Sequence, residues 1–256
     1  MRTLRLLVRQ VGYEQRTYWR TPSSAFFTFA FPLVLLFIFT TMYRSTSLAA
    51  LGGMSYAQYF VPGIVAFGVI SACYTNLAIT LCFRRDLGVL KRLRGTPLPA
   101  WAFMGGHIGS SLVVSALLAV ITTAVGIAVY DVRAPAHAGA LAVSLVAGAF
   151  CFCALGLAVT ALIPNAHAAP AAVNGALFPL LFISGTFFPL DPTSGLARVA
   201  ALFPVGNFQH AVFAAFDPRA GGVAGLQSHD LGAMLLWGAG ALVFAVRRFR
   251  WEPRHR

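Results

Sequence analysis

The chain has 256 residues, of which 58% are hydrophobic and only 10% are charged, and its mean hydropathy is +0.76. Soluble domains carry roughly 25% charged residues, so this composition excludes an ordinary water-soluble domain and predicts an all-α polytopic membrane protein. The net charge of +12 would favour a nucleic-acid partner in a soluble protein, but membrane topology explains its distribution better, and we expect no nucleic-acid partner.

Residues 2–21 predict an amphipathic helix that lies in the membrane interface and ends before Pro22. Leucine, valine and aromatic side chains occupy one face of this helix. The opposite face carries Arg2, Arg5, Arg9, Arg16 and Arg20. We expect these arginines to contact anionic lipid headgroups, or to act only as a topology anchor.

Six apolar segments are long enough, or nearly so, to cross a bilayer, which takes about 20 mostly apolar residues. They are 24–43, 59–83, 102–130, 138–163, 168–188 and 231–246. None of the six contains Asp, Glu, Lys or Arg. We therefore expect one transmembrane domain over residues 1–256, with six spanning helices and no separate soluble domain.

Basic residues gather in three of the segments outside these spans: the N-terminal helix, the connection 84–101 between spans two and three, and the C-terminal segment after residue 246. These three segments hold fifteen of the nineteen basic residues and only three of the seven acids. The positive-inside rule therefore predicts that both termini and 84–101 are cytoplasmic. We expect a multi-pass protein of a bacterial cytoplasmic (inner) membrane.

Residues 189–230 form a long connection between spans five and six. Its part 195–216 is too apolar for a solvated loop and too interrupted for a full span. We expect short helices broken at Pro204 and Gly206, in a re-entrant or outer-interface position.

Polar residues inside the spans have two interpretations. They are Ser71, Thr75, Asn76 and Asn174. They line a path for an amphipathic substrate, or they form the hydrogen bonds between helices that are common in membrane bundles.

The connection 84–101, RRDLGVLKRLRGTPLPAW, is amphipathic if residues 84–94 form one helix. Leu87, Leu90 and Leu93 would then form a stripe flanked by basic residues, and the Thr96-Pro97 step would end the helix. A rigid charged element that continues two spans is suited to transmit movement from a cytoplasmic partner.

No motif for chemistry accompanies these features. The chain lacks a phosphate-binding loop with Gly-Lys-Ser/Thr, a metalloprotease His-Glu-x-x-His and a Gly-x-Ser-x-Gly nucleophile. We therefore expect no catalytic, cofactor or metal site. Because ionisable groups inside spans mark ion-coupled transport, their absence suggests that any transport takes its energy from outside the bilayer.

Two stretches resemble the membrane subunits of type-2 ABC transporters. They are DLGVLKRLRGTPLP (86–99) and LLFISGTFFPLDPTSGLARVAALFPVGNF (180–208). In the first, Asp86 stands where members of that family often have Glu. The compact six-span form is most similar to the drug-resistance and lipid-export branch.

The resemblance implies a permease subunit without enzyme activity that pairs with an identical or homologous permease and with two separate ATPase subunits, which use ATP and Mg²⁺. It implies that a coupling helix within 86–97 docks the ATPase through Asp86, Leu87, Leu90, Lys91, Leu93, Arg94, Thr96 and Pro97. It also implies an outer gate, which we assign to Gly185, Phe187, Phe188 and Pro189.

The cargo implied is hydrophobic or amphipathic, either a drug-like molecule or a lipid. Alternatives are a permease that exports a polysaccharide or glycolipid, a channel unrelated to ABC transporters, and an integral membrane enzyme acting on lipid.

Overall fold

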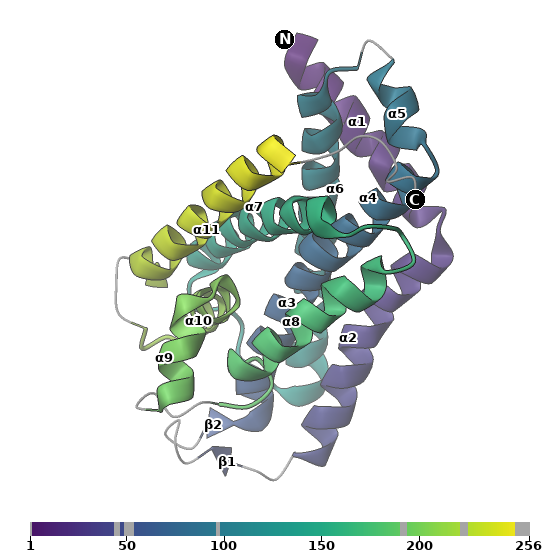
Figure 1. Ribbon diagram of the computed structural model, residues 1–256. Helices are drawn as coiled ribbons and strands as arrows, with labels where there is room; N and C mark the ends of the chain where they lie inside the picture. Colours follow the sequence, from purple (N-terminus) through teal and green to yellow (C-terminus); the bar gives the residue numbers. More distant parts are fainter. Residues whose placement is uncertain are drawn as a thin grey trace.

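The computed structural model describes residues 2–43, 47–48, 54–95, 98–189, 194–220 and 225–248, and these form a helical bundle with one short hairpin (Figure 1). In chain order the elements are α1 (Arg2–Trp19), α2 (Pro22–Met42), β1 (Ser47–Leu48), β2 (Met54–Ser55), α3 (Tyr56–Ile70), a π-helical turn (Ser71–Thr75), α4 (Asn76–Asp86), α5 (Val89–Arg94), α6 (Ala100–Tyr130), α7 (Ala138–Leu162), α8 (Ala169–Ile183), α9 (Gly195–Leu202), α10 (Pro204–Phe216) and α11 (Ser228–Arg248). The two strands pair antiparallel, with Ser47 opposite Ser55.

Four helical segments in the described part of the chain are long and apolar enough to cross a membrane. They are Tyr56–Asp86, Trp101–Tyr130, Ala138–Leu162 and Ser228–Arg248. They overlap the second, third, fourth and sixth predicted spans in sequence. A fifth arises if the bent pair α9–α10 counts as one span, whereas the apolar helices Thr28–Met42 and Ala169–Ile183 are shorter. By length and composition the described residues thus give four or five candidate spans.

The centre of the bundle is formed by α3 and α7. Almost every side chain of α3 is buried, and this helix contacts α2, α6 and α10. Helix α7 has small residues along its buried face and packs along α11. The other helices leave apolar side chains on the outside, such as Leu236 of α11 and Val120 of α6. A bundle with an apolar exterior is expected for a protein surrounded by lipid.

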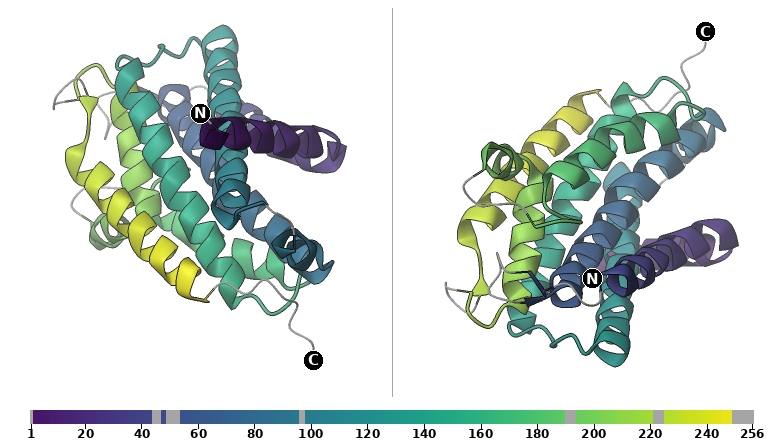
Figure 2. Two further views of the ribbon diagram at one scale, coloured as in Figure 1. Left: turned by 90° about the horizontal axis from the view of Figure 1, so that it is seen from above. Right: turned by 90° about the horizontal axis from the view of Figure 1, so that it is seen from below.

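Helix α1 crosses the first half of α6 at the edge of the bundle, as Figure 2 shows from above. Close approach is allowed by Gly105 and Gly109 of α6, where an added Cβ would lie 2.7 Å from a Leu7 methyl and 2.6 Å from a Val11 methyl. Part of the apolar face of α1 therefore packs against protein.

The second span is interrupted by the π-helical turn Ser71–Thr75, in which the N–H of Asn76 donates to the carbonyl of Ser71. Such turns insert one residue into a helix and often occur at functional sites. The hydroxyl of Thr75, in this turn, is buried without a hydrogen-bond partner.

The connection 195–216 bends by 99° between α9 and α10. The predicted break at Pro204 is confirmed, because α9 ends at Leu202 and proline occupies the first position of α10. The predicted break at Gly206 is wrong. This glycine lies within α10, where its missing side chain makes room for the carbonyl of Ala200. Helix α10 is buried among α3, α7 and α11.

Candidate functional site

One end of the bundle gathers α1, the last turns of α4, α5 and the C-terminal end of α11, while the hairpin and α9 lie at the opposite end (Figure 1). The first group contains the elements that the sequence marks as basic. The end of α4 also meets the connection between α7 and α8 there. Charged side chains at the end of α4, with their partners on α1, α6 and this connection, form the candidate site.

The predicted single helix over 84–94 is wrong in one respect. Helix α4 ends at Asp86, and a turn at Leu87 and Gly88 separates it from the six-residue α5. Gly88 adopts φ +69°, a left-handed conformation that glycine takes without strain. The turn therefore changes the direction of the chain before α5 begins.

Because of this turn, the three leucines do not form one stripe. Leu87 is 68% exposed, Leu90 is completely buried in the core, and Leu93 is partly buried against it. Leu90 thus holds α5 onto the bundle and presents no surface to a partner, whereas Leu87 and Lys91 are exposed. Thr96, Pro97 and the side chain of Arg94 lie outside the described part of the structure.

Arg85 belongs to the basic connection that the sequence places in the cytoplasm, and its side chain is only 2% exposed at the end of α4. Its guanidinium donates to the carbonyls of Thr160 at 3.0 Å, Ile163 at 2.9 Å and Pro164 at 3.3 Å, at the C-terminal end of α7. The Thr160 carbonyl needs an outside donor, because the residue four positions later is proline and has no N–H. A cation at a helix C-terminus is also favoured by the helix dipole.

Asp86 completes this contact. One carboxylate oxygen accepts from Arg85 Nε at 3.4 Å, and the other accepts from the backbone N–H of Ala166 at 2.6 Å. Ala166 lies in the turn just before α8 begins at Ala169. The pair Arg85–Asp86, which we call the clamp, therefore fixes the end of α4 to the connection between α7 and α8.

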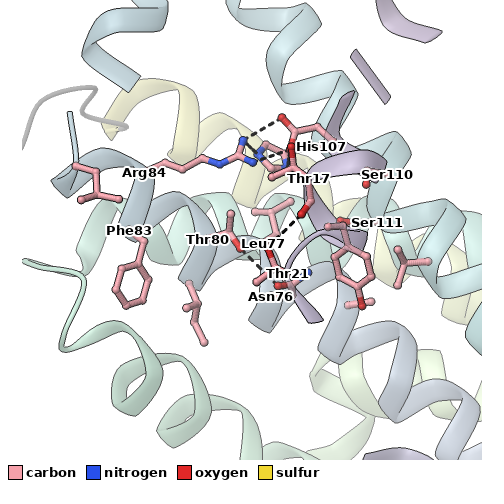
Figure 3. A pocket seen from close by; sticks show the side chains of 16 residues that line it. Thr17, Thr21, Asn76, Leu77, Thr80, Phe83, Arg84, His107, Ser110 and Ser111 are labelled. Atoms are coloured by element: carbon pink, nitrogen blue, oxygen red, sulfur yellow. Dashed lines mark hydrogen bonds and ion pairs between the residues drawn. The ribbon is translucent and has the colours of Figure 1, made fainter. Parts of the chain in front are cut away.

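A second charged cluster joins α1, α4 and α6 through Glu14, Arg84 and His107, of which Arg84 and His107 are labelled in Figure 3. Both terminal nitrogens of Arg84 donate to the carboxylate of Glu14, at 2.9 and 2.8 Å, and Glu14 is 3% exposed. The Nε2 of His107 lies 2.8 Å from Arg84 Nη1. Since arginine only donates, this nitrogen must accept, so the imidazole is neutral and carries its proton on Nδ1. That nitrogen faces Glu14 Oε2 at 3.5 Å.

Beside this ion pair lies a cavity of about 330 Å³ between α1, α4 and α6 (Figure 3). Its polar lining comprises Thr17, Thr21, Asn76, Thr80, Ser110 and Ser111. Leu77, Ile79 and Val114 contribute an apolar wall, and the partly exposed Phe83 and Leu87 also border the cavity. Burial raises the pKa of Tyr18, another lining residue, which keeps its hydroxyl protonated.

A family model for ABC-2 type transporters matches residues 7–216, from α1 to the end of α10. The chain belongs to the ABC-2 type transporter family. It is also similar to the inner membrane transport permease YadH of Escherichia coli strain K12, of E. coli O157:H7 and of Shigella flexneri. In each case 24% of 159 residues are identical, and the match covers 62% of this chain and 61% of the relative. The matched part is thus less than two thirds of the length of these curated relatives.

In this ABC-2 family chain the residues predicted for a substrate path do not converge. Asn76 lines the cavity, where Thr80 Oγ1 lies 3.5 Å from its amide oxygen. Ser71, Thr75 and Asn174 are not among the residues that line it, and Asn174 lies half-buried on α8.

At the opposite end, the predicted gate residues lie in a turn of residues 184–189, which we call the outer turn. Gly185 has φ +79°, and Phe187 is buried while Phe188 is 46% exposed. The hydroxyl of Tyr56 donates to the Phe187 carbonyl at 3.0 Å, and that of Tyr59 donates to the Gly185 carbonyl.

The ring of Phe187 also packs against rings from α2, α3 and α8. They belong to Phe39, Phe60, Phe67 and Phe182, with centroids 5.4 to 6.5 Å away. Pro189, at the end of the outer turn, is half-buried. The predicted gate residues are thus held by the second span and its neighbours.

The predicted interfacial arginines Arg5, Arg9, Arg16 and Arg20 are exposed on α1, as the helical periodicity requires. The side chain of Arg2 lies outside the described part.

Sequence reasoning missed Glu14, Arg84, Arg85 and His107 as site residues. Glu14 carried a usable signal, because it is an acid on the apolar face of an amphipathic helix, where burial requires a buried cation as partner. Arg84 and Arg85 carried no such signal, since basic residues at the end of a span are expected from topology alone.

Proposed function

We propose that this chain is the membrane-spanning permease subunit of an ATP-driven exporter in a bacterial inner membrane. The single observation that carries the proposal is the match to the ABC-2 type transporter family over residues 7–216. The similarity to relatives named inner membrane transport permeases supports it. In this proposal ATP hydrolysis with Mg²⁺ takes place on two separate ATPase subunits, and a second permease, identical or homologous, completes the transporter.

The proposed topology has six spans, with α2 and α8 added to the four long segments. Helix α2 has 21 residues and, at about 1.5 Å per residue, is about 31 Å long, enough for the hydrocarbon core. Helix α8 is shorter, and the outer turn would complete its crossing. Both termini and α5 then face the cytoplasm, α1 lies in the inner interface with its exposed arginines toward anionic headgroups, and α10 is a buried re-entrant helix.

ATPase docking is assigned to α5 and the turn before it. Exposed Leu87 offers an apolar contact and exposed Lys91 a charge, while buried Leu90 and partly buried Leu93 fix α5 to the bundle. The clamp then gives a route for movement. A displacement of α5 by the ATPase would move α4, and the contacts of Arg85 and Asp86 would transmit that movement to the junction of α7 and α8. Because these hydrogen bonds are buried and charge-assisted, the junction should move as one piece with α4.

The outer turn is the proposed exit gate. Its hydrogen bonds to Tyr56 and Tyr59 of α3 tie it to the same span that ends in the clamp. Movement of that span relative to α8 would therefore open or close the turn. The cargo we propose is hydrophobic or amphipathic, a drug-like molecule or a lipid, because the six apolar segments predicted from the sequence contain no Asp, Glu, Lys or Arg to bind a charged one.

Co-purification tests this function. An affinity-tagged chain extracted from its native membrane is expected to retain an ATPase subunit with Walker motifs. Leu87→Asp places a charge in the proposed apolar contact and should remove most of that ATPase. Leu196→Asp is the matched control, because Leu196 is 55% exposed on α9 at the opposite end. No ATPase with the unchanged chain, or equal ATPase with both variants, contradicts the proposal.

A further inference from the structure

We propose that the cavity between α1, α4 and α6 is a binding site for an amphipathic molecule with an uncharged, hydroxyl-bearing head. This inference rests on the proposed function, in which such a molecule would be received from the inner leaflet. It assigns the substrate class and the place of first contact within a single subunit.

The walls of the cavity differ in chemistry. The lining combines the hydroxyls of α1 and α6, together with Asn76 and Thr80 of α4, with aliphatic side chains of α4 and α6. A volume of about 330 Å³ is at the lower end of the range for small-molecule sites, enough for a polar head and the first carbons of a chain. Phe83, which is 42% exposed, borders the cavity where the rest of an acyl chain could leave toward the lipid.

The ionised groups of the cavity already satisfy each other. Both oxygens of Glu14 accept from Arg84, and His107 is neutral in the same cluster. A charged head would enter a partly buried site without a free counter-charge, and desolvation would then oppose its binding. An uncharged head avoids this cost, so the closed ion pair discriminates against phosphate and ammonium groups.

The uncharged polar groups have unused capacity for hydrogen bonds. The hydroxyl of Thr17 donates to the carbonyl of Tyr13 at 3.0 Å and that of Thr21 to the carbonyl of Thr17 at 3.1 Å, so both oxygens remain acceptors. Asn76 has two donors and an acceptor oxygen, and the 3.5 Å contact with Thr80 is at the limit of a hydrogen bond. The site thus needs a head that donates and accepts, as a hydroxyl does.

The test uses the purified full-length chain in phosphatidylcholine nanodiscs with a photoreactive dioleoylglycerol as probe. Illumination should label peptides of α1, α4 or α6, and unlabelled dioleoylglycerol should compete while dioleoylphosphatidylglycerol should not. The double variant Asn76→Leu, Thr80→Val keeps the number and branching of the heavy side-chain atoms and removes the polar groups. Loss of two neutral hydrogen bonds should weaken labelling about tenfold.

Thr123→Val is the matched control, because Thr123 is a half-buried threonine of α6 that does not line this cavity. Equal labelling of the unchanged chain and the double variant overturns the inference, as does equal competition by the anionic lipid. Co-purification of the ATPase is measured on the same preparations. If the unchanged chain retains the ATPase but is not labelled, only this inference is overturned. If the unchanged chain does not retain the ATPase, the proposed function is overturned.

Discussion

The clamp makes a quantitative prediction for Arg85→Leu. This substitution removes the donor to the carbonyls of Thr160 and Ile163, which are 3.0 and 2.9 Å from the guanidinium. Hydrogen bonds to charged groups contribute roughly 1.5–3 kcal/mol each. Since Pro164 is exposed and water can reach that end of the junction, we take the lower limit and expect unfolding free energy to fall by about 3 kcal/mol.

The native cysteines provide the assay. Cys73, Cys82, Cys151 and Cys153 are free and buried, so a fluorogenic maleimide reacts with them only as the bundle opens. In detergent, Arg85→Leu should unfold under much milder conditions than the unchanged chain. Arg85→Lys should show a smaller loss of stability, because lysine keeps the charge but lacks the planar arrangement of donors.

Arg92→Leu is the control for this prediction, because Arg92 is exposed and its guanidinium donates to the Leu87 carbonyl at 3.2 Å within the same segment. This substitution should change the free energy of unfolding by no more than about 0.5 kcal/mol. If Arg85→Leu and Arg92→Leu unfold alike, the clamp does not hold the junction and the route for movement from α5 to α7 and α8 is refuted.

Three further substitutions test the packing of the two ends by the same unfolding assay. Arg84→Met should lower the free energy of unfolding by about 3–5 kcal/mol, because it leaves Glu14 buried and unpaired. Adding Glu14→Leu should restore part of this free energy. A double variant that is no more stable than Arg84→Met contradicts the pairing. Gly63→Ala should destabilise by at least about 1–3 kcal/mol, because its Cβ would overlap a carbonyl of the outer turn, whereas Gly175→Ala, with open space around it, should be neutral or slightly stabilising. Phe187→Ala should lower the free energy of unfolding by about 3–5 kcal/mol, because the packing of its ring is lost. A decrease below about 1 kcal/mol would show that this ring does not hold the outer turn.

The long spans could be predicted from the sequence because burial in lipid imposes a simple rule on composition. The segment from Ala138 to Leu162 differs from its predicted range by one residue, since the helix must satisfy its own backbone wherever no water is available. The apolar segment 168–188 is longer than its helix, because α8 ends at Ile183 and Gly185, with φ +79°, lies in the turn that follows. Hydropathy does not distinguish a buried turn from a continuing helix.

Local conformation near the docking segment was harder to predict. The leucine spacing in 84–94 fits one helix, but Gly88 allows a left-handed turn, and the energy of burying Leu90 decides where α5 lies. The clamp depends on a contact between residues about 75 positions apart, between Arg85 and Thr160. A single sequence contains no periodicity that reports such a contact.

The central claim is that the segment after α4 contacts an ATPase, and site-specific cross-linking tests it most directly. A photoreactive benzoylphenylalanine at position 87, on the exposed side of the turn before α5, should form an adduct with an ATPase subunit in native membranes, while the same residue at position 196 on α9 should not. Adducts from position 87 that contain only lipid or another copy of this chain, or ATPase adducts from position 196, would contradict the account.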